Sequence, residues 1–303
     1  MTTSGLLGIY IPKIKTLRAV LLLALTLSAG SLSAQGRVFW QEGGVVVCDS
    51  TWEVDQAAAA DGSGGIISVW SDKRGDRGVW AQRVDRDGNV VWQRNGVFLR
   101  GGTMSPHQFT VVPDGGGGLI AVWYESFAGP YDFQVTAQRV DSSGAVRWGP
   151  AGVVVVGTNL GRVFEVSAVS DGRGGILVGW VMTPTESTGV DTLCVQRLDS
   201  LGRPCWGSPG LVVMSDTLDI RSPKMCEDGS GGAYIAWSAT ESSQYRPTVQ
   251  RADSGGRLLW PTRGIQVLSS DGGPIALRPA HEGYVILCGV AQRIRAQLLD
   301  PAG

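Results

Sequence analysis

The sequence predicts an all-β, five-bladed β-propeller with four antiparallel strands per blade, and three observations carry this prediction. A motif recurs every 53 to 57 residues, the segments between its turns are rich in β-forming residues, and the two ends of the chain hold complementary parts of one further repeat. Four-stranded units repeated around an axis are typical of propellers, whose radial closure leaves only short, protected edges. A β-sandwich array is the alternative, although about 54 residues is small for an independent core.

Each repeat combines a glycine-rich turn, a Gln-Arg-x-Asp segment and two tryptophans. The turn, Asp-Gly-x-Gly-Gly, begins at Asp61, Asp114, Asp171 and Asp228. The Gln-Arg-x-Asp segment begins at Gln82, Gln138, Gln196 and Gln250. The two tryptophan columns are Trp70, Trp123, Trp180 and Trp237, and Trp40, Trp92, Trp148, Trp206 and Trp260. We interpret the tryptophans as packing between blades, and the glycines as turn positions that need a positive φ.

The repeats divide the chain into five blades, near 48–96, 97–152, 153–210, 211–264 and 265–303, the last completed by residues 36–47. The fifth copy is degraded and lacks a glycine-to-tryptophan strand, which the segment from Gly36 to Trp40 supplies. The mature N-terminal strand is therefore predicted to complete the last blade. In the second repeat the alternation and turn signals predict strands at 108–112, 119–124, 134–140 and 145–148, the last continuing into 153–156.

The first 34 residues have the composition of an export signal. Lys13, Lys15 and Arg18 precede an apolar run at 19–27, and a Ser-Leu-Ser-Ala segment follows before Gln35. Because that run is shorter than the roughly 20 residues that cross a bilayer, a retained membrane anchor is the less favoured alternative. We expect residues 1–34 to be a signal peptide and 35–303 to be a single secreted or periplasmic propeller domain. No membrane span is expected after cleavage, and the protein is expected to be a monomer.

Charge and composition exclude several function classes. The formal net charge of −1 falls by three units once the signal is removed, and the Lys and Arg residues are scattered, so no nucleic-acid partner is expected. No metal or cofactor is expected: Asp85-x-Asp87-Gly88 lacks the further acidic positions of a calcium loop, and no phosphate loop or nucleophile elbow occurs. Arg74-Gly-Asp76 matches an adhesion tripeptide that short sequences often contain by chance. A disulfide between Cys194 and Cys205 stays open as an alternative to free thiols.

Two groups of residues are candidates for binding or catalysis. Irregular loops that join the second and third strands of each blade carry exposed aromatic side chains suited to sugar rings or to a protein partner. Polar side chains stand near the entry to each innermost strand, where they are predicted to surround the channel mouth. The candidate ligand-binding residues are Trp52, Gln108, Arg162, Tyr124, Tyr131 and Tyr245. If the protein is an enzyme, its candidate catalytic carboxylates are Asp55, Glu165 and Asp219, because glycoside hydrolysis needs two carboxyl groups about 5 to 10 Å apart.

The complete repeat resembles a class of exported bacterial propeller-like repeat proteins, many of which carry a C-terminal sorting domain. The resemblance covers nearly all of the mature chain but implies no reaction or ligand. An Asp/Gly turn ahead of a tryptophan also resembles sialidase propellers, yet its spacing differs from theirs. The sequence therefore favours a non-catalytic binding or scaffold module for carbohydrate or an extracellular protein, and the alternative is a glycoside hydrolase with carboxylates at the channel mouth.

Overall fold

The computed structural model describes residues 40–49, 55–74, 77–102, 105–127, 129, 132–158, 160–183, 189–241, 244–267, 274–280, 283–290 and 293–300. The chain divides into two compact units, Met1–Glu42 and Gly43–Gly303. All the strands belong to the second unit, and no helix occurs among the described residues. Accordingly, the described part contains no helix that is long and apolar enough to cross a membrane. Trp40–Glu42 are the described residues of the first unit.

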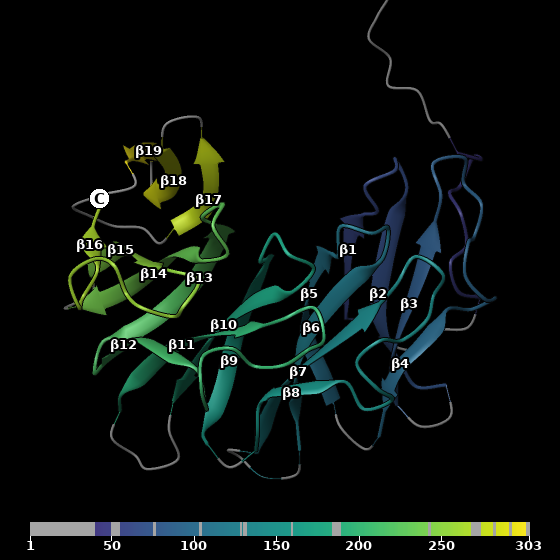
Figure 1. Ribbon diagram of the computed structural model, residues 1–303, viewed down its shortest axis with the longest axis horizontal. Coiled ribbons are helices and arrows are strands. Elements are labelled where there is room, and N and C mark those ends of the chain that lie inside the picture. Colours follow the sequence, from purple (N-terminus) through teal and green to yellow (C-terminus); the bar gives the residue numbers. More distant parts are fainter. Residues whose placement is uncertain are drawn as a thin grey trace, which may run out of the picture. The chain divides into compact units, whose positions relative to one another are not determined.

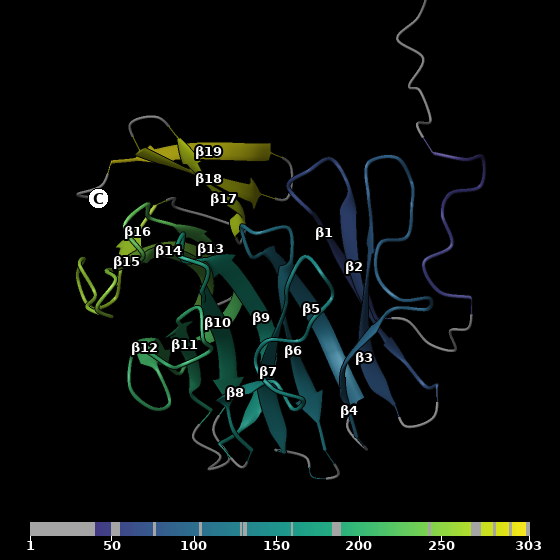
Figure 2. The same ribbon diagram turned by 45° about the vertical axis from the view of Figure 1, so that its right-hand side comes forward.

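In the described part of the chain, nineteen strands form five antiparallel sheets, and each sheet follows the order of the sequence (Figures 1 and 2). The first sheet contains β1 (Gln56–Ala60), β2 (Ile66–Asp72), β3 (Gly78–Val84) and β4 (Val97–Gly101). The second contains β5 (Ser105–Pro113), β6 (Leu119–Ser126), β7 (Phe133–Val140) and β8 (Val153–Val156). The third contains β9 (Arg162–Ser170), β10 (Ile176–Thr183), β11 (Asp191–Leu198) and β12 (Leu211–Asp216). The fourth contains β13 (Asp219–Glu227), β14 (Ala233–Glu241), β15 (Gln244–Ala252) and β16 (Ile265–Gln266), and the fifth contains β17 (Pro274–Ala280), β18 (Gly283–Val290) and β19 (Arg293–Leu299).

The first strands of successive sheets lie next to one another. β1 contacts β5, β5 contacts β9, β9 contacts β13, and β13 contacts β17. Each buried apolar cluster likewise spans two neighbouring sheets; Trp148 of the second sheet, for example, packs with Val163 and Ile176 of the third. This is the arrangement of propeller blades, in which the first strand is innermost, and it confirms the all-β fold built from four-stranded antiparallel sheets.

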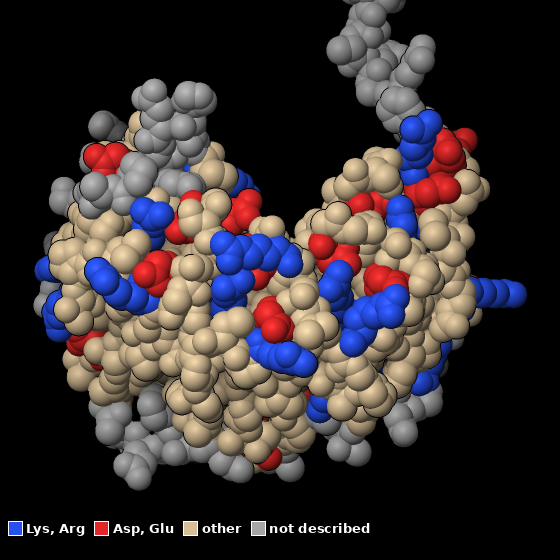
Figure 3. Space-filling view, in the orientation of Figure 1, with Lys and Arg blue, Asp and Glu red and all other residues tan. Residues whose placement is uncertain are grey.

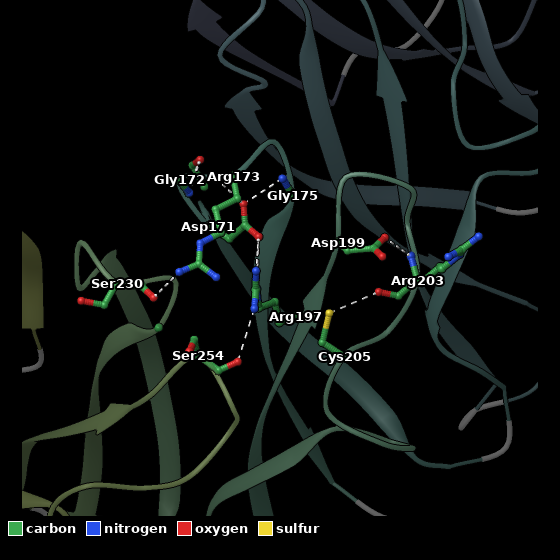
Figure 4. A network of polar contacts seen from close by, with 12 residues as sticks. Asp171, Gly172, Arg173, Gly175, Arg197, Asp199, Arg203, Cys205, Ser230 and Ser254 are labelled. Carbon is green, nitrogen blue, oxygen red and sulfur yellow. Dashed lines mark hydrogen bonds and ion pairs between the residues drawn. The ribbon is translucent and has the colours of Figure 1, made fainter.

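The aspartate of each Asp-Gly-x-Gly-Gly turn is buried and closes the turn from within. One carboxylate oxygen accepts hydrogen bonds from the amides two and four residues later, at 2.8–2.9 Å. The other oxygen pairs with the arginine of the Gln-Arg-x-Asp segment on the third strand, at 2.9–3.0 Å. Figure 4 shows one such pair, Asp171 and Arg197, and also shows Arg197 reaching the Ser254 carbonyl of the next sheet. The carboxylate therefore holds a turn and a neighbouring strand together, and its arginine extends the network to the next blade.

The glutamine of the Gln-Arg-x-Asp segment is buried and uses both ends of its amide. In the second sheet, the Gln138 oxygen accepts from the backbone amides of Arg139 and Trp148 at 3.0 and 3.2 Å, while its nitrogen donates to the Gly149 carbonyl at 2.7 Å. Gln82, Gln196 and Gln250 repeat the pattern. Because an unpaired buried amide is costly, this pairing fixes the path of the chain between the third and fourth strands.

The tryptophan that follows this segment joins one sheet to the next. Trp148 donates its indole N–H to the Ser200 carbonyl at 3.2 Å, and its ring lies over Gly202, where an added Cβ would meet ring atoms at 3.0 Å. Trp92 and Trp206 make the same contacts with the Ser142 and Ser254 carbonyls of their following sheets, at 3.1 Å. The interpretation of these tryptophans as packing between blades agrees with this geometry.

Three features differ from the sequence expectations or add to them. Residues 145–148 form no strand, and Val146 makes only an isolated bridge with Val140. The backbone N–H of Trp148 donates to the side-chain oxygen of Gln138 and so is not used for strand pairing. The fourth strand is therefore β8 alone. The sequence placed blade boundaries at positions 96, 152, 210 and 264. The strand that follows each boundary pairs with the preceding sheet, so each of the first four sheets extends one strand past its predicted boundary. The thiols of Cys194 and Cys205 are free rather than bridged, and Cys194 is buried while Cys205 is exposed.

The fifth sheet has three strands among the described residues. The segment predicted to complete it lies partly outside the described residues, at 36–39, and residues 40–47 form no strand. Completion of the last blade by the N-terminal segment therefore stays a prediction.

Replacement of Gly202 by alanine tests the contact between sheets. Its φ of +79° opposes a Cβ, and an added Cβ would also meet Val153 Cγ2 at 2.8 Å and the Trp148 ring at 3.0 Å, so G202A is expected to lower the free energy of unfolding by about 2–4 kcal/mol. Gly149 has a φ of +74° but nothing within 4 Å of an added Cβ, so G149A reports the backbone cost alone, about 1 kcal/mol. Equal losses of the two variants in chemical denaturation would show that the packing over Gly202 leaves room for a Cβ.

Candidate functional site

The innermost strands carry backbone bulges at one equivalent position. Gln108, Glu165 and Ser222 have φ values of 51°, 57° and 54°, and the pairing of each strand with its neighbour shifts register there. The left-handed backbone conformation costs residues other than glycine about 1–3 kcal/mol, and it persists only where surrounding contacts impose it. Such strain is concentrated at functional sites. Asp55 occupies the equivalent place immediately before β1.

Side chains at these positions connect successive sheets through backbone hydrogen bonds. The backbone N–H of Gln108 donates to a carboxylate oxygen of Asp55 at 2.7 Å. The backbone N–H of Val166 donates to the side-chain oxygen of Gln108 at 3.0 Å. The Ser222 amide in turn donates to the carboxylate of Glu165. We call Asp55, Gln108 and Glu165 the acceptor series, because each accepts a hydrogen bond from the bulge of the next sheet. Sequence reasoning placed these residues together at the innermost strands but did not detect this bonding.

A small pocket opens between the first and second sheets beside this series. It has a volume of about 110 Å³ and is lined by Asp55, Ser71, Asp72, Lys73, Arg77, Pro106 and His107. Asp72 is buried against Arg74, whereas Lys73 is exposed at the rim. The sequence pointed to this wall only through the irregular loops that join the second and third strands of each blade, and Asp72, Lys73 and Arg77 were not among its candidate residues.

Tyr124 adjoins the pocket from the second sheet. It pairs across the strands with His107, and the two rings lie 5.5 Å apart between centroids. Burial raises the pKa of the Tyr124 phenol and the Asp55 carboxylate raises it further, while the Arg162 guanidinium acts in the opposite direction. Tyr124 therefore stays protonated near neutral pH and lies within electrostatic reach of both charges. Asp55, His107, Tyr124 and Arg162 thus form a mouth cluster drawn from three sheets.

The other predicted site residues are distributed differently. Asp219 is exposed and pairs with Arg221 at 2.7 Å, and that guanidinium also lies 4.4 Å from the Phe164 ring centroid. Tyr245, 44 % exposed, belongs to β15 in the fourth sheet, which contributes no residue to the mouth cluster. Trp52 and Tyr131 lie outside the described residues.

Two other sequence motifs have local roles in the first sheet. Arg74 of the adhesion-like tripeptide is engaged by Asp72, by the Asn95 carbonyl and by the face of Trp80; Gly75 and Asp76 lie outside the described residues. The Asp85 carboxylate accepts from the amides of Asp87 and Asn89, which closes its turn. No group of three or more His, Cys, Asp or Glu side chains in the described part of the chain is placed to hold a metal ion.

No known family profile matches this sequence, and no curated protein does. Solved structures do. An ulvan lyase of a new polysaccharide lyase family, bound to -[GlcA(1-4)Rha3S]-, aligns with a TM-score of 0.51 and 10% identity over 81% of this chain and 64% of its own. The endo-arabinase of Bacteroides thetaiotaomicron aligns at 0.43 and 11%, covering 84% and 96% of the two chains. The Penicillium chrysogenum α-L-arabinanase complexed with arabinobiose aligns at 0.47 and 12%, covering 80% and 77%.

These matches have two consequences. The likeness to the lyase concerns the fold, and this chain spans just under two thirds of that protein's length. The prediction of a non-catalytic binding or scaffold module is corrected by the alignment at a TM-score of 0.51, because that neighbour is a polysaccharide lyase and fits the enzyme alternative better.

Glu165 offers a test of the acceptor series. E165Q keeps a side-chain oxygen for the Ser222 amide and should change the free energy of unfolding by less than about 1 kcal/mol, whereas E165A leaves that amide unpaired and should cost about 1–3 kcal/mol. D219A, which removes a surface ion pair, is the control and should cost at most about 1 kcal/mol. If E165Q and E165A unfold alike in denaturant, the hydrogen bond is not what the carboxylate contributes.

Proposed function

We propose that this protein is a carbohydrate-active enzyme that cleaves a polysaccharide at the mouth cluster. The observation that carries the proposal is the convergence of Asp55, His107 and Tyr124 beside a pocket on the innermost strands. Polysaccharide cleavage requires groups that accept and donate protons, and an imidazole next to a protonated phenol supplies both. The polysaccharide-cleaving neighbours of the same fold support this class of substrate.

The carboxylates considered for glycoside hydrolysis contribute unequally to this proposal. Asp55 lines the pocket and remains available to it through its exposed side chain, although one oxygen accepts from Gln108. Glu165 is bonded to the Ser222 amide, and Asp219 is paired with Arg221. We therefore assign the proton chemistry to His107 and Tyr124 and give Asp55 an electrostatic role beside them. The export signal that the sequence predicts in residues 1–34 favours action on polysaccharide outside the cytoplasm.

Tyr124 and Tyr245 form a matched pair for testing the site. Y124F removes the proposed proton donor and should lower kcat roughly 10²- to 10⁴-fold on the polysaccharide that the wild-type protein cleaves, because general acid–base groups contribute on that order. Y245F, the same substitution in the fourth sheet, should leave kcat unchanged. The measurement is depolymerisation of a panel of neutral and acidic polysaccharides, followed by chain length and by new reducing ends. A wild-type protein that leaves the whole panel intact would contradict the proposal.

We also propose that the five sheets close into a ring of five blades, with residues 36–47 contributing the missing strand of the β17–β18–β19 sheet. The described residues give that sheet three strands where its neighbours have four, which supports this closure, as does the match of the segment from Gly36 to Trp40 to the absent part of the fifth repeat.

Removal of residues 36–47 tests closure. A chain that begins at residue 48 should melt at least about 5 °C below one that begins at residue 35, because losing a strand that joins the first and last blades costs several kcal/mol and each kcal/mol shifts Tm by roughly 2–4 °C in a protein of this size. Equal melting temperatures would refute closure by this segment.

A further inference from the structure

The carboxylates around the mouth already have partners. Asp55 and Glu165 accept backbone hydrogen bonds from the next sheet, and Asp219 pairs with Arg221. Asp72, which lines the pocket, is buried against Arg74. Each of these carboxylates therefore has a partner within the protein, and Asp55, which is exposed, also lines the pocket.

Arg162 differs from the arginines of the repeats. It is the first residue of β9 and is exposed, and its side chain makes no hydrogen bond or ion pair within the part of the chain that the structure describes. By contrast, Arg83, Arg139 and Arg197 each hold a buried aspartate. The bridge between Gly161 and Asp132 brings the backbone beside Arg162 against the second sheet, and Arg162 acts electrostatically on Tyr124.

Further positive groups lie on the other side of the mouth cluster. Lys73 and Arg77 line the pocket that His107 and Asp55 share. Lys and Arg side chains are accordingly interspersed with acidic ones over the middle of the surface in Figure 3. A sugar chain crossing from the pocket to Arg162 would pass His107 and Tyr124 with cationic groups on both sides.

We propose that the substrate is an anionic polysaccharide and that Arg162 binds its carboxylate or sulfate groups. This inference rests on the proposed function and names the substrate class of the same site. A planar guanidinium binds either group through two parallel charge-assisted hydrogen bonds, which an ammonium group does not reproduce. The Arg162 side chain makes no ion pair within the described residues, and the neighbouring carboxylates have partners of their own. Its charge is therefore suited to an acidic ligand, since a neutral sugar chain would leave that charge unpaired.

Three polymers and three variants test this inference. Binding and cleavage are measured with a polyuronate, a sulfated galactan and a neutral arabinan, each at low and high salt. R162A should weaken affinity for the acidic polymer roughly ten- to hundred-fold, as expected for losing hydrogen bonds to a charged group, and R162K should recover part of that loss. Affinity of the wild-type protein should also fall with added salt. The control R86A removes an exposed arginine from the β3 turn on the opposite face and should change nothing.

The outcomes separate the two proposals. Preference for the polyuronate assigns Arg162 to a carboxylate, and preference for the sulfated galactan assigns it to a sulfate. Cleavage of the arabinan alone, unaffected by R162A, would overturn the anionic substrate while leaving the proposed function in place. Arginine-dependent binding of an acidic polymer without cleavage of any polymer would support Arg162 as the anion-binding residue and refute the enzyme. Identical affinity of R162A and R86A for every polymer would overturn the role of Arg162.

Discussion

A buried aspartate–arginine pair is the interaction on which the rest of the structure depends. In each of the first four sheets one carboxylate closes the turn after the innermost strand and also pairs with the third strand, so it fixes three strands with respect to one another. Burial of an ion pair is favourable only when the remaining hydrogen-bonding positions are filled, and here the turn amides fill them. The adjacent glutamine and tryptophan then extend this rigid unit to the fourth strand and to the next sheet.

The repeats made much of this fold predictable from sequence. The glycine turns, the four-stranded units and the contacts between tryptophans and the next sheet all follow from residues that recur at fixed spacing. The misplaced strand at 145–148 shows where such reasoning fails. Its composition is that of a strand, but the side-chain oxygen of Gln138 competes with strand pairing for the Trp148 amide, and sequence spacing does not reveal that competition.

The site was predictable only in part. Sequence register brought Asp55, Gln108 and Glu165 to one level of the fold, yet it gave no sign that their own side chains accept hydrogen bonds from the next sheet. Bulges at residues other than glycine leave no motif, because the left-handed backbone is imposed by tertiary contacts. Tyr124 and Tyr245 were grouped as loop aromatics, and only the structure separates the residue beside His107 from the one in the fourth sheet.

The acceptor series requires an oxygen at each position but not a charge. An aspartate, a glutamine and a glutamate perform the same structural task in three successive sheets, because a carboxylate and an amide both accept from a backbone N–H. Exchange between acid and amide at positions 55, 108 and 165 would therefore alter the electrostatic potential above the innermost strands while the strands keep their connections. In this scaffold the ionic character of the mouth and the integrity of the fold are separable traits, and the charge of the mouth is free to diverge at little cost in folding.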